Sequence, residues 1–291
     1  MSFRASINEI FLCIINGVFM IMGTILNSVV IISLWRSSNL RKKLCYFMIF
    51  VLSCFDLVVA SITHPIIVFV TVSLAFQTYN VLFVQIAILI LNHLYGFAMF
   101  ALLTLNVERF LSIVYPIFHR KCVTKRRLLS IIAFLQILTI VLSTLSFQDV
   151  LISGRIIVTV IPVTLFLLFL YLNYSIFLVA KQRKNKVCVA ESPVDDQKEK
   201  RHIILEFRKA FTCFLAVICF HLCTLPSIVI GALCFVWNTS LFDEKVVHLA
   251  LWIPTISSIN STLNCLLLFW KNLVLRHEGM KIIKFFQQES R

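Results

Sequence analysis

Long runs of apolar residues, separated by short polar stretches, dominate the chain. The hydrocarbon core of a bilayer is about 30 Å thick, and a helix of roughly 20 apolar residues crosses it with its backbone hydrogen bonds satisfied. Runs of that length predict seven membrane-spanning helices, at residues 10–34, 44–70, 81–112, 128–147, 156–180, 207–237 and 246–270. No charged residue lies between Asp56 and Glu108, a stretch too long for one crossing, so a turn is predicted within 71–80. The predicted fold class is an all-α membrane protein, a single seven-helix bundle over residues 1–291.

The composition excludes most other classes of protein. The chain is 60% hydrophobic and 14% charged, with a mean hydropathy of +0.95, which leaves too little polar surface for a water-soluble globule. Six Gly and six Pro argue against a β-barrel, and ten Cys in 291 residues are too few for a disulfide scaffold. The first apolar run is longer than the core of a signal peptide and no small-residue cleavage site follows it, so we expect an uncleaved first crossing.

The positive charge of the chain has a strongly one-sided distribution. Apart from Arg4, Arg109, Arg155 and Lys245, every Lys and Arg lies in 35–43, in 115–127, in 181–209 or after Trp270. These four segments fall on one side of a seven-crossing topology, which the positive-inside rule assigns to the cytoplasm. The net charge of +14 is therefore interpreted as a cytoplasmic-face signature, and no nucleic-acid partner is expected.

Two segments on the predicted cytoplasmic side are longer than a simple turn and predict structure of their own. Residues 181–206 are polar and predict a flexible cytoplasmic loop that includes helix extensions. After Trp270, apolar residues alternate with Arg276, Lys281 and Lys284, which predicts an amphipathic helix over 272–286 lying on membrane lipid.

Asp56 lies in the middle of the second apolar run. Ionisable groups inside a membrane are costly and usually functional, although a hydrogen-bonded structural carboxyl group is the alternative. Its expected partners are Asn27 in the first run and Asn260 and Asn264 in the seventh. The last two are four residues apart and share one helix face.

The order of the polar motifs resembles one known family over nearly the whole chain. Glu108-Arg109-Phe110, at the inner end of the third run, resembles the Asp/Glu-Arg-Tyr motif of rhodopsin-like (class A) G-protein-coupled receptors. Further matches to that family's motifs, each on the expected run, are Asn27, Asp56, Tyr174, Phe220, Pro226, Asn260 and Asn264.

The resemblance implies a conformational switch. Arg109 would be held in the inactive state by Glu108 and by Glu206, although Arg109 and Glu206 could also be two solvated charges. Tyr174, Phe220 and Asn264 would belong to the same switch. Helix six, kinked at Pro226, would then swing outward and open a cavity for a heterotrimeric G protein. Such a receptor would lie in the plasma membrane with its N-terminus extracellular and its C-terminus cytoplasmic.

Several positions depart from the family pattern. Thr224 stands where the family usually has Trp, and Cys265 and Leu268 replace the Pro and Tyr of the seventh-helix motif. Ala98 stands where a hydroxyl often serves the sodium site, which disfavours Na⁺ at Asp56, and no other cofactor is expected. No Cys lies between Cys54 and Cys122, so the family's usual disulfide cannot form and no disulfide is predicted.

The expected ligand is a small molecule or a lipid, neutral or apolar, bound between the helices. Leu91 stands where amine receptors carry Asp, and no Lys lies between Lys245 and Lys271, which excludes an opsin. The expected pocket residues are Leu91, Asn92, Tyr95, Ser227, Gly231, Trp252 and Ser258. Ordinary bundle packing is the alternative for Tyr95 and Trp252.

Other functions have weaker support. A receptor without G-protein signalling and a small membrane transporter are the alternatives, although a transporter usually shows repeats and several intramembrane charges. No catalytic constellation is present, so no enzyme is expected. The dispersed histidines His64, His93, His221 and His248 predict interior residues and no metal site. Asn238-Thr-Ser240 is a candidate glycosylation site.

Overall fold

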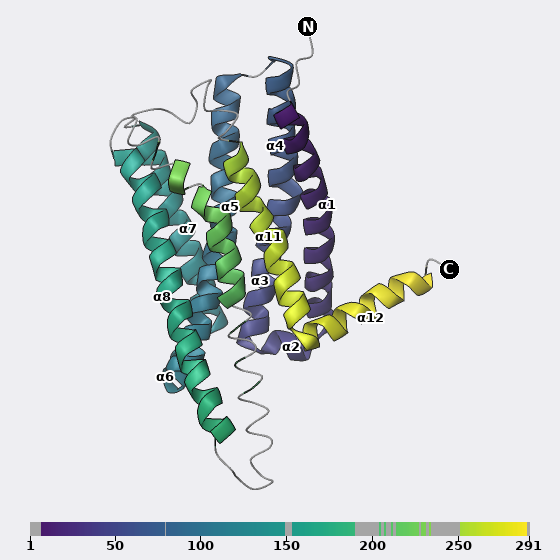
Figure 1. Cartoon of the computed structure of the whole chain (residues 1–291), viewed down its shortest axis with the longest axis vertical. Helices are drawn as coiled ribbons and strands as arrows, with labels where there is room; N and C mark the ends of the chain where they lie inside the picture. The colour runs from purple at the N-terminus through teal and green to yellow at the C-terminus, as the bar shows by residue number, and fades with distance from the viewer. Residues whose placement is uncertain are drawn as a thin grey trace.

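The computed structural model describes residues 7–78, 80–148, 153–189, 204, 207, 211, 214–226, 228–230, 233 and 251–289. Every regular element among them is helical, so the predicted all-α class is confirmed for this part of the chain (Figure 1). The elements are α1 (Ile7–Arg36), α2 (Ser38–Lys42), α3 (Leu44–Val58), the π-helix η1 (Val59–Thr63), α4 (His64–Ala75), α5 (Val81–Val114), α6 (Pro116–Cys122), α7 (Lys125–Gln148), α8 (Ser153–Val189), α11 (Trp252–Lys271) and α12 (Leu273–Glu289). A further apolar helical segment, Phe214–Ile230, is called the helix-six segment below.

Four helical stretches of the described chain are long and apolar enough to cross a membrane. They are Ile7–Arg36, Leu44–Ala75, Leu82–Val114 and Val163–Arg183. The remaining predicted crossings correspond to α7, to the helix-six segment and to α11. Helix α11 is less apolar than those four stretches because seven Ser, Thr and Asn residues lie between Trp252 and Cys265.

The turn between the second and third runs is shorter than predicted. The helix that was predicted to end at residue 70 continues to Ala75, because the polar Thr71 and Ser73 bond to carbonyls of their own helix. The chain then turns at Gln77, whose φ of 56° lies in the left-handed region. Asn80 begins α5 as its N-cap, since its side chain accepts a hydrogen bond of 2.8 Å from the backbone N–H of Leu82.

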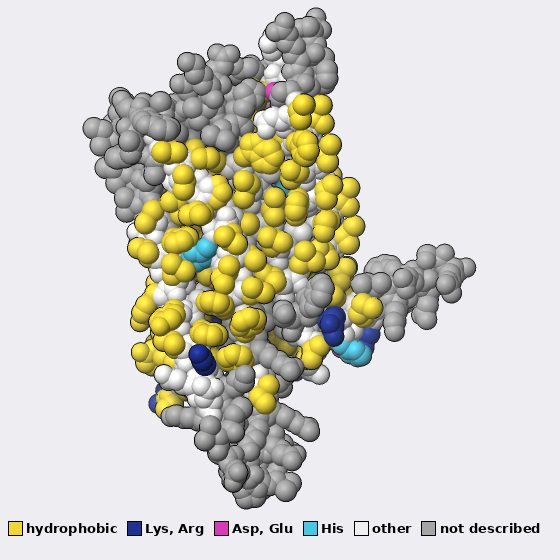
Figure 2. All heavy atoms as spheres, viewed as in Figure 1, with side chains coloured by type: hydrophobic (Ala, Val, Ile, Leu, Met, Phe, Trp, Pro, Cys, Tyr) yellow, Lys and Arg dark blue, Asp and Glu magenta, His cyan; other side chains and the backbone are white. Residues whose placement is uncertain are grey.

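The helices pack as one bundle around α5 and α11. Helix α1 packs against α3, α4 and α11, whereas α5 packs against α3, α7 and α8. Large apolar side chains also cover the outside of the bundle, and Figure 2 shows them over the middle of one face, with Lys and Arg side chains toward its lower end. A chain whose apolar side chains face both inward and outward is compatible with a bilayer rather than with water.

Helix α12 leaves the bundle sideways, at the end where α2 and α6 lie (Figure 1). Its Leu275 and Ile282 are buried, whereas Arg276 and Lys281 are exposed. Gly279 packs directly against the ring of Phe269 in α11, and a Cβ atom at this position would force the ring to shift. This amphipathic helix, predicted over 272–286, spans Leu273–Glu289.

Candidate functional site

A cluster of buried polar side chains lies in the middle of the bundle. Asp56 of α3 is 1% exposed, and the side chains of Ser261 and Asn264 from α11 face its carboxyl group. Of the three predicted partners of Asp56, the structure thus places Asn264 at its carboxyl group, and it adds Ser261, which was not predicted from the sequence. Asn27 of α1 instead donates from Nδ2 to the carbonyl of Gly23 in its own helix, at 2.9 Å.

The cluster is covered by a close approach of three elements. A Cβ atom added to Gly23 of α1 would lie 2.8 Å from Cβ of Ala60 in η1 and 2.7 Å from Oγ1 of Thr262 in α11. Both distances are shorter than side-chain contacts allow. Glycine is therefore required at this position for α1, η1 and α11 to meet.

Several oxygens of the cluster are buried without a hydrogen-bond partner among the described residues. They are Oδ1 of Asp56 and Asn264 and Oγ of Ser261. The Oδ1 atoms of Asn27 and Asn260, the other predicted partners of Asp56, are likewise buried without such a partner. A carboxylate surrounded by amide and hydroxyl oxygens is the donor chemistry that hard cations prefer. Ala98 contributes no oxygen, but Ser261 supplies a hydroxyl that the sequence had not indicated, so the residues present fit Na⁺ by donor type.

A second polar cluster links α1, α4 and α11 through direct hydrogen bonds. Asn16 donates from Nδ2 to Oγ1 of Thr255 at 3.0 Å and to the carbonyl of Leu12 at 2.8 Å. Its Oδ1 is then the acceptor for His64, so Nδ1 of His64 carries the proton of this 2.7 Å bond. His64 had been predicted only as an interior histidine, because residues of three different helices have no characteristic spacing.

The π-helix η1 lies between the two clusters. Asp56 and His64 are eight residues apart, and a regular α-helix would place them roughly 80° from each other around its axis. The wider turn of η1 rotates the chain less per residue and brings the two side chains toward the same side. Single π-helical turns occur frequently at functional sites.

The C-terminal end of α5 carries a buried charge cluster. Glu108 has a side chain only 3% exposed, and its Oε2 lies 3.7 Å from Nε of Arg109. Its Oε1 lies 3.0 Å from Nε2 of His119 in α6. Nearby, Arg183 of α8 donates to the carbonyl of Ile113 at 2.6 Å, which fixes α8 against the same end of α5. Glu206, the other predicted partner of Arg109, lies outside the described residues.

His119 was missed in the sequence, although one signal was present. Pro116 starts α6 immediately after α5, and a residue one turn further can point back to the end of the preceding helix. Burial, and then the positive charge of Arg109, lower the pKa of His119 below its ordinary value. His119 is therefore neutral at neutral pH, and its Nε2–H donates to the Glu108 carboxylate.

No known protein-family model matches this chain, and no curated protein is significantly similar to it. Any functional conclusion therefore depends on the residues and their geometry.

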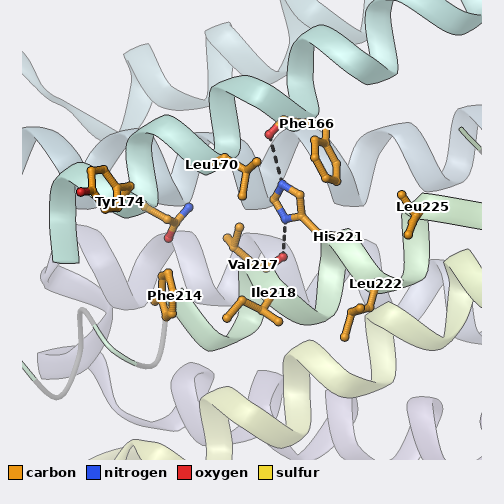
Figure 3. A pocket seen from close by; sticks show the side chains of 10 residues that line it. Phe166, Leu170, Tyr174, Phe214, Val217, Ile218, His221, Leu222 and Leu225 are labelled. Atoms are coloured by element: carbon orange, nitrogen blue, oxygen red, sulfur yellow. Dashed lines mark hydrogen bonds between the residues drawn. The ribbon is translucent and has the colours of Figure 1, made fainter. Parts of the chain in front are cut away.

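A groove of about 430 Å³ lies between α8 and the helix-six segment. Its walls are almost entirely apolar, and Figure 3 shows His221 at its centre with Phe166, Leu170 and Tyr174 on the opposite helix. Nε2 of His221 lies 3.1 Å from the carbonyl of Phe166, which links the helix-six segment to α8. Tyr174, predicted as part of the switch, is 61% exposed at this groove.

The core beside this groove contains further predicted switch residues. Phe220 is buried and its ring lies 4.7 Å from that of Phe169 in α8. Thr224, in place of the family's Trp, donates to the carbonyl of Phe220 and lies beside Tyr95 of α5. Pro226 follows on the same helix and is half-buried. Cys265 and Leu268 of α11 are buried in the same apolar core.

The predicted ligand-pocket residues that the structure describes do not line this groove. Leu91 is buried in an apolar cluster with Leu12 and Ile67, and Trp252 donates from Nε1 to Oδ1 of Asn8 at 2.9 Å. Ser258 donates to the carbonyl of Pro254 in its own helix. Outside the described parts lie the side chain of Asn92 and the residues Ser227, Gly231 and Asn238.

Proposed function

We propose that this protein is a plasma-membrane receptor with seven crossings, which binds a small neutral or apolar molecule or a lipid and activates a heterotrimeric G protein. The N-terminus is extracellular and the C-terminus cytoplasmic. On the cytoplasmic side, α12 packs its buried face against the bundle and rests on the inner leaflet through the exposed apolar residues Leu273, Val274 and Met280 and its basic residues.

The observation that carries the proposal is the charge cluster at the end of α5. Arg109 lies beside the Glu108 carboxylate, whose side chain is only 3% exposed, at the point where a basic connecting segment begins. Ion pairs that are fully solvated contribute little, but a shielded pair with a second partner on α6 has two distinct arrangements available. The polar core around Asp56 supports the same proposal, because it places rearrangeable side chains between α3 and α11.

The switching step follows from this chain's own residues. In the resting arrangement Glu108 holds Arg109, and His221 holds the helix-six segment against α8. Outward movement of the inner end of that segment is facilitated at Pro226, which lacks a backbone N–H to bond within the helix. The movement frees the space into which Arg109 extends toward the G protein.

The test is guanine-nucleotide exchange on a panel of purified G proteins, with the protein in lipid nanodiscs and a library of neutral small molecules and lipids. Arg109→Ala should lower exchange at least tenfold while ligand binding is retained. Arg276→Ala, a matched loss of an exposed Arg on α12, should leave exchange unchanged. Equal exchange in the Arg109→Ala variant would reject the role of Arg109. Ligand binding without exchange on any G protein would favour the non-signalling receptor instead.

A further inference from the structure

The carboxylate of Glu108 has two nitrogen partners on different elements. Arg109, its neighbour on α5, approaches Oε2 through Nε at 3.7 Å, whereas His119 on α6 approaches Oε1 through Nε2 at 3.0 Å. The side chains of Arg109 and His119 are 13% and 19% exposed, so water and protons from the cytoplasmic side reach both. Of the two contacts, only the one to His119 is short enough for a direct hydrogen bond.

We propose that His119 and Arg109 compete for Glu108, so that protonation of His119 at low cytoplasmic pH releases Arg109 and makes the receptor proton-sensitive. The competition among these three side chains can be tested without a G protein. The consequence for signalling rests on the proposed G-protein function.

The charges around His119 determine the direction of the effect. Helix α6 packs against α5, whose groups facing His119 are the anion Glu108 and the cation Arg109. The other charged residues of α6, Arg120 and Lys121, are not buried. A protonated His119 therefore attracts Glu108 and repels Arg109 across a short distance.

The contact distances also favour His119 over Arg109 as the partner of Glu108 once the imidazole is charged. A charge-assisted hydrogen bond is roughly twice as strong as a neutral one, and the contact at 3.0 Å already has hydrogen-bond length. The Arg109 contact at 3.7 Å is a looser ion pair. Because burial and then the charge of Arg109 lower the pKa of His119, the imidazole takes up its proton at a lower pH than an ordinary histidine does.

The first experiment needs no G protein. The ring signal of His119 is followed by NMR against pH in lipid nanodiscs, and it is assigned by its disappearance in His119→Gln. Arg109→Gln removes a repelling charge and should raise the titration midpoint, whereas Glu108→Gln removes an attracting charge and should lower it. If neither substitution moves the midpoint, the competition is rejected.

The second experiment measures ligand-free nucleotide exchange at pH 7.5 and pH 5.0, because the pKa of His119 is lowered from its ordinary value. Wild-type exchange should rise about twofold to fivefold at the lower pH, the effect expected for loss of one loose ion pair. His119→Gln keeps a donor but cannot be protonated and should abolish the rise. His277→Gln, a matched loss of an exposed histidine on α12, should retain it.

The outcomes separate the two proposals. A rise that persists in His119→Gln overturns the assignment of the proton sensor to His119. NMR midpoints that move as predicted, together with no exchange on any G protein, support the competition and reject the proposed coupling.

Discussion

Two buried polar regions hold α1 against α11, and they do so by different means. In the first, Asn16, His64 and Thr255 join three helices through direct hydrogen bonds, and every polar group of the Asn16 side chain is used. In the second, around Asp56, the helices meet through the bare backbone of Gly23, and several buried oxygens lack a partner among the described residues.

This difference indicates that the first region serves stability and the second serves function. A buried polar group without a hydrogen bond costs about 1–3 kcal/mol, so a region with several such groups is not built for stability alone. The first region can therefore be understood as a clamp that fixes α1, α4 and α11. The region around Asp56 keeps oxygens available for a cation, for water or for a second arrangement of the helices.

The largest expected effect comes from filling the helix contact at Gly23. Gly23→Ala places a Cβ less than 3 Å from Ala60 and Thr262, so α1 must shift, and the free energy of unfolding should fall by about 2–3 kcal/mol. Thermal unfolding in nanodiscs measures this loss. Gly17→Ala on the same helix meets nothing within 4 Å and should be neutral or stabilising by up to about 1 kcal/mol. Equal effects of the two variants would contradict the close approach.

A smaller effect is expected from opening the clamp. Asn16→Ala leaves the Nδ1–H of His64 buried without its acceptor and should lower the free energy of unfolding by about 1–2 kcal/mol in the same measurement. Ser73→Ala, which removes an exposed hydroxyl bonded within its own helix, serves as the control and should change stability by less than about 0.5 kcal/mol. A clamp variant as stable as this control would show that the three-helix network contributes nothing.

The smallest effect on the free energy of unfolding is expected from a substitution at Asp56, and it should be close to zero or stabilising. Asp56→Asn keeps the shape and removes the ionisable group from the buried site, so stability should stay within about 1 kcal/mol of the wild type or rise. Adding NaCl should raise the unfolding temperature of the wild type and not of this variant, with choline chloride as the ionic-strength control. A strongly destabilised Asp56→Asn protein would mean that both regions are structural.

The sequence predicted the elements better than the contacts between them. The bilayer sets one length for every crossing, so apolar runs such as 10–34 and 81–112 coincide closely with α1 and α5. The interior position of Asp56 also followed from its surroundings in the chain. By contrast, the Asn16–His64 bond and the Glu108–His119 contact depend on the rotation of one helix relative to another, which no local spacing encodes. The π-helix η1 likewise has no residue signature, although it decides which way His64 points.

The central claim is that the chain crosses the membrane an odd number of times, with its basic segments in the cytoplasm. The most direct measurement places an epitope tag before residue 7 or after residue 289 and compares antibody binding to intact and permeabilised cells. The N-terminal tag should be stained on intact cells, and the C-terminal tag only after permeabilisation. Staining of both tags under the same condition would contradict the odd number of crossings and the receptor function with it.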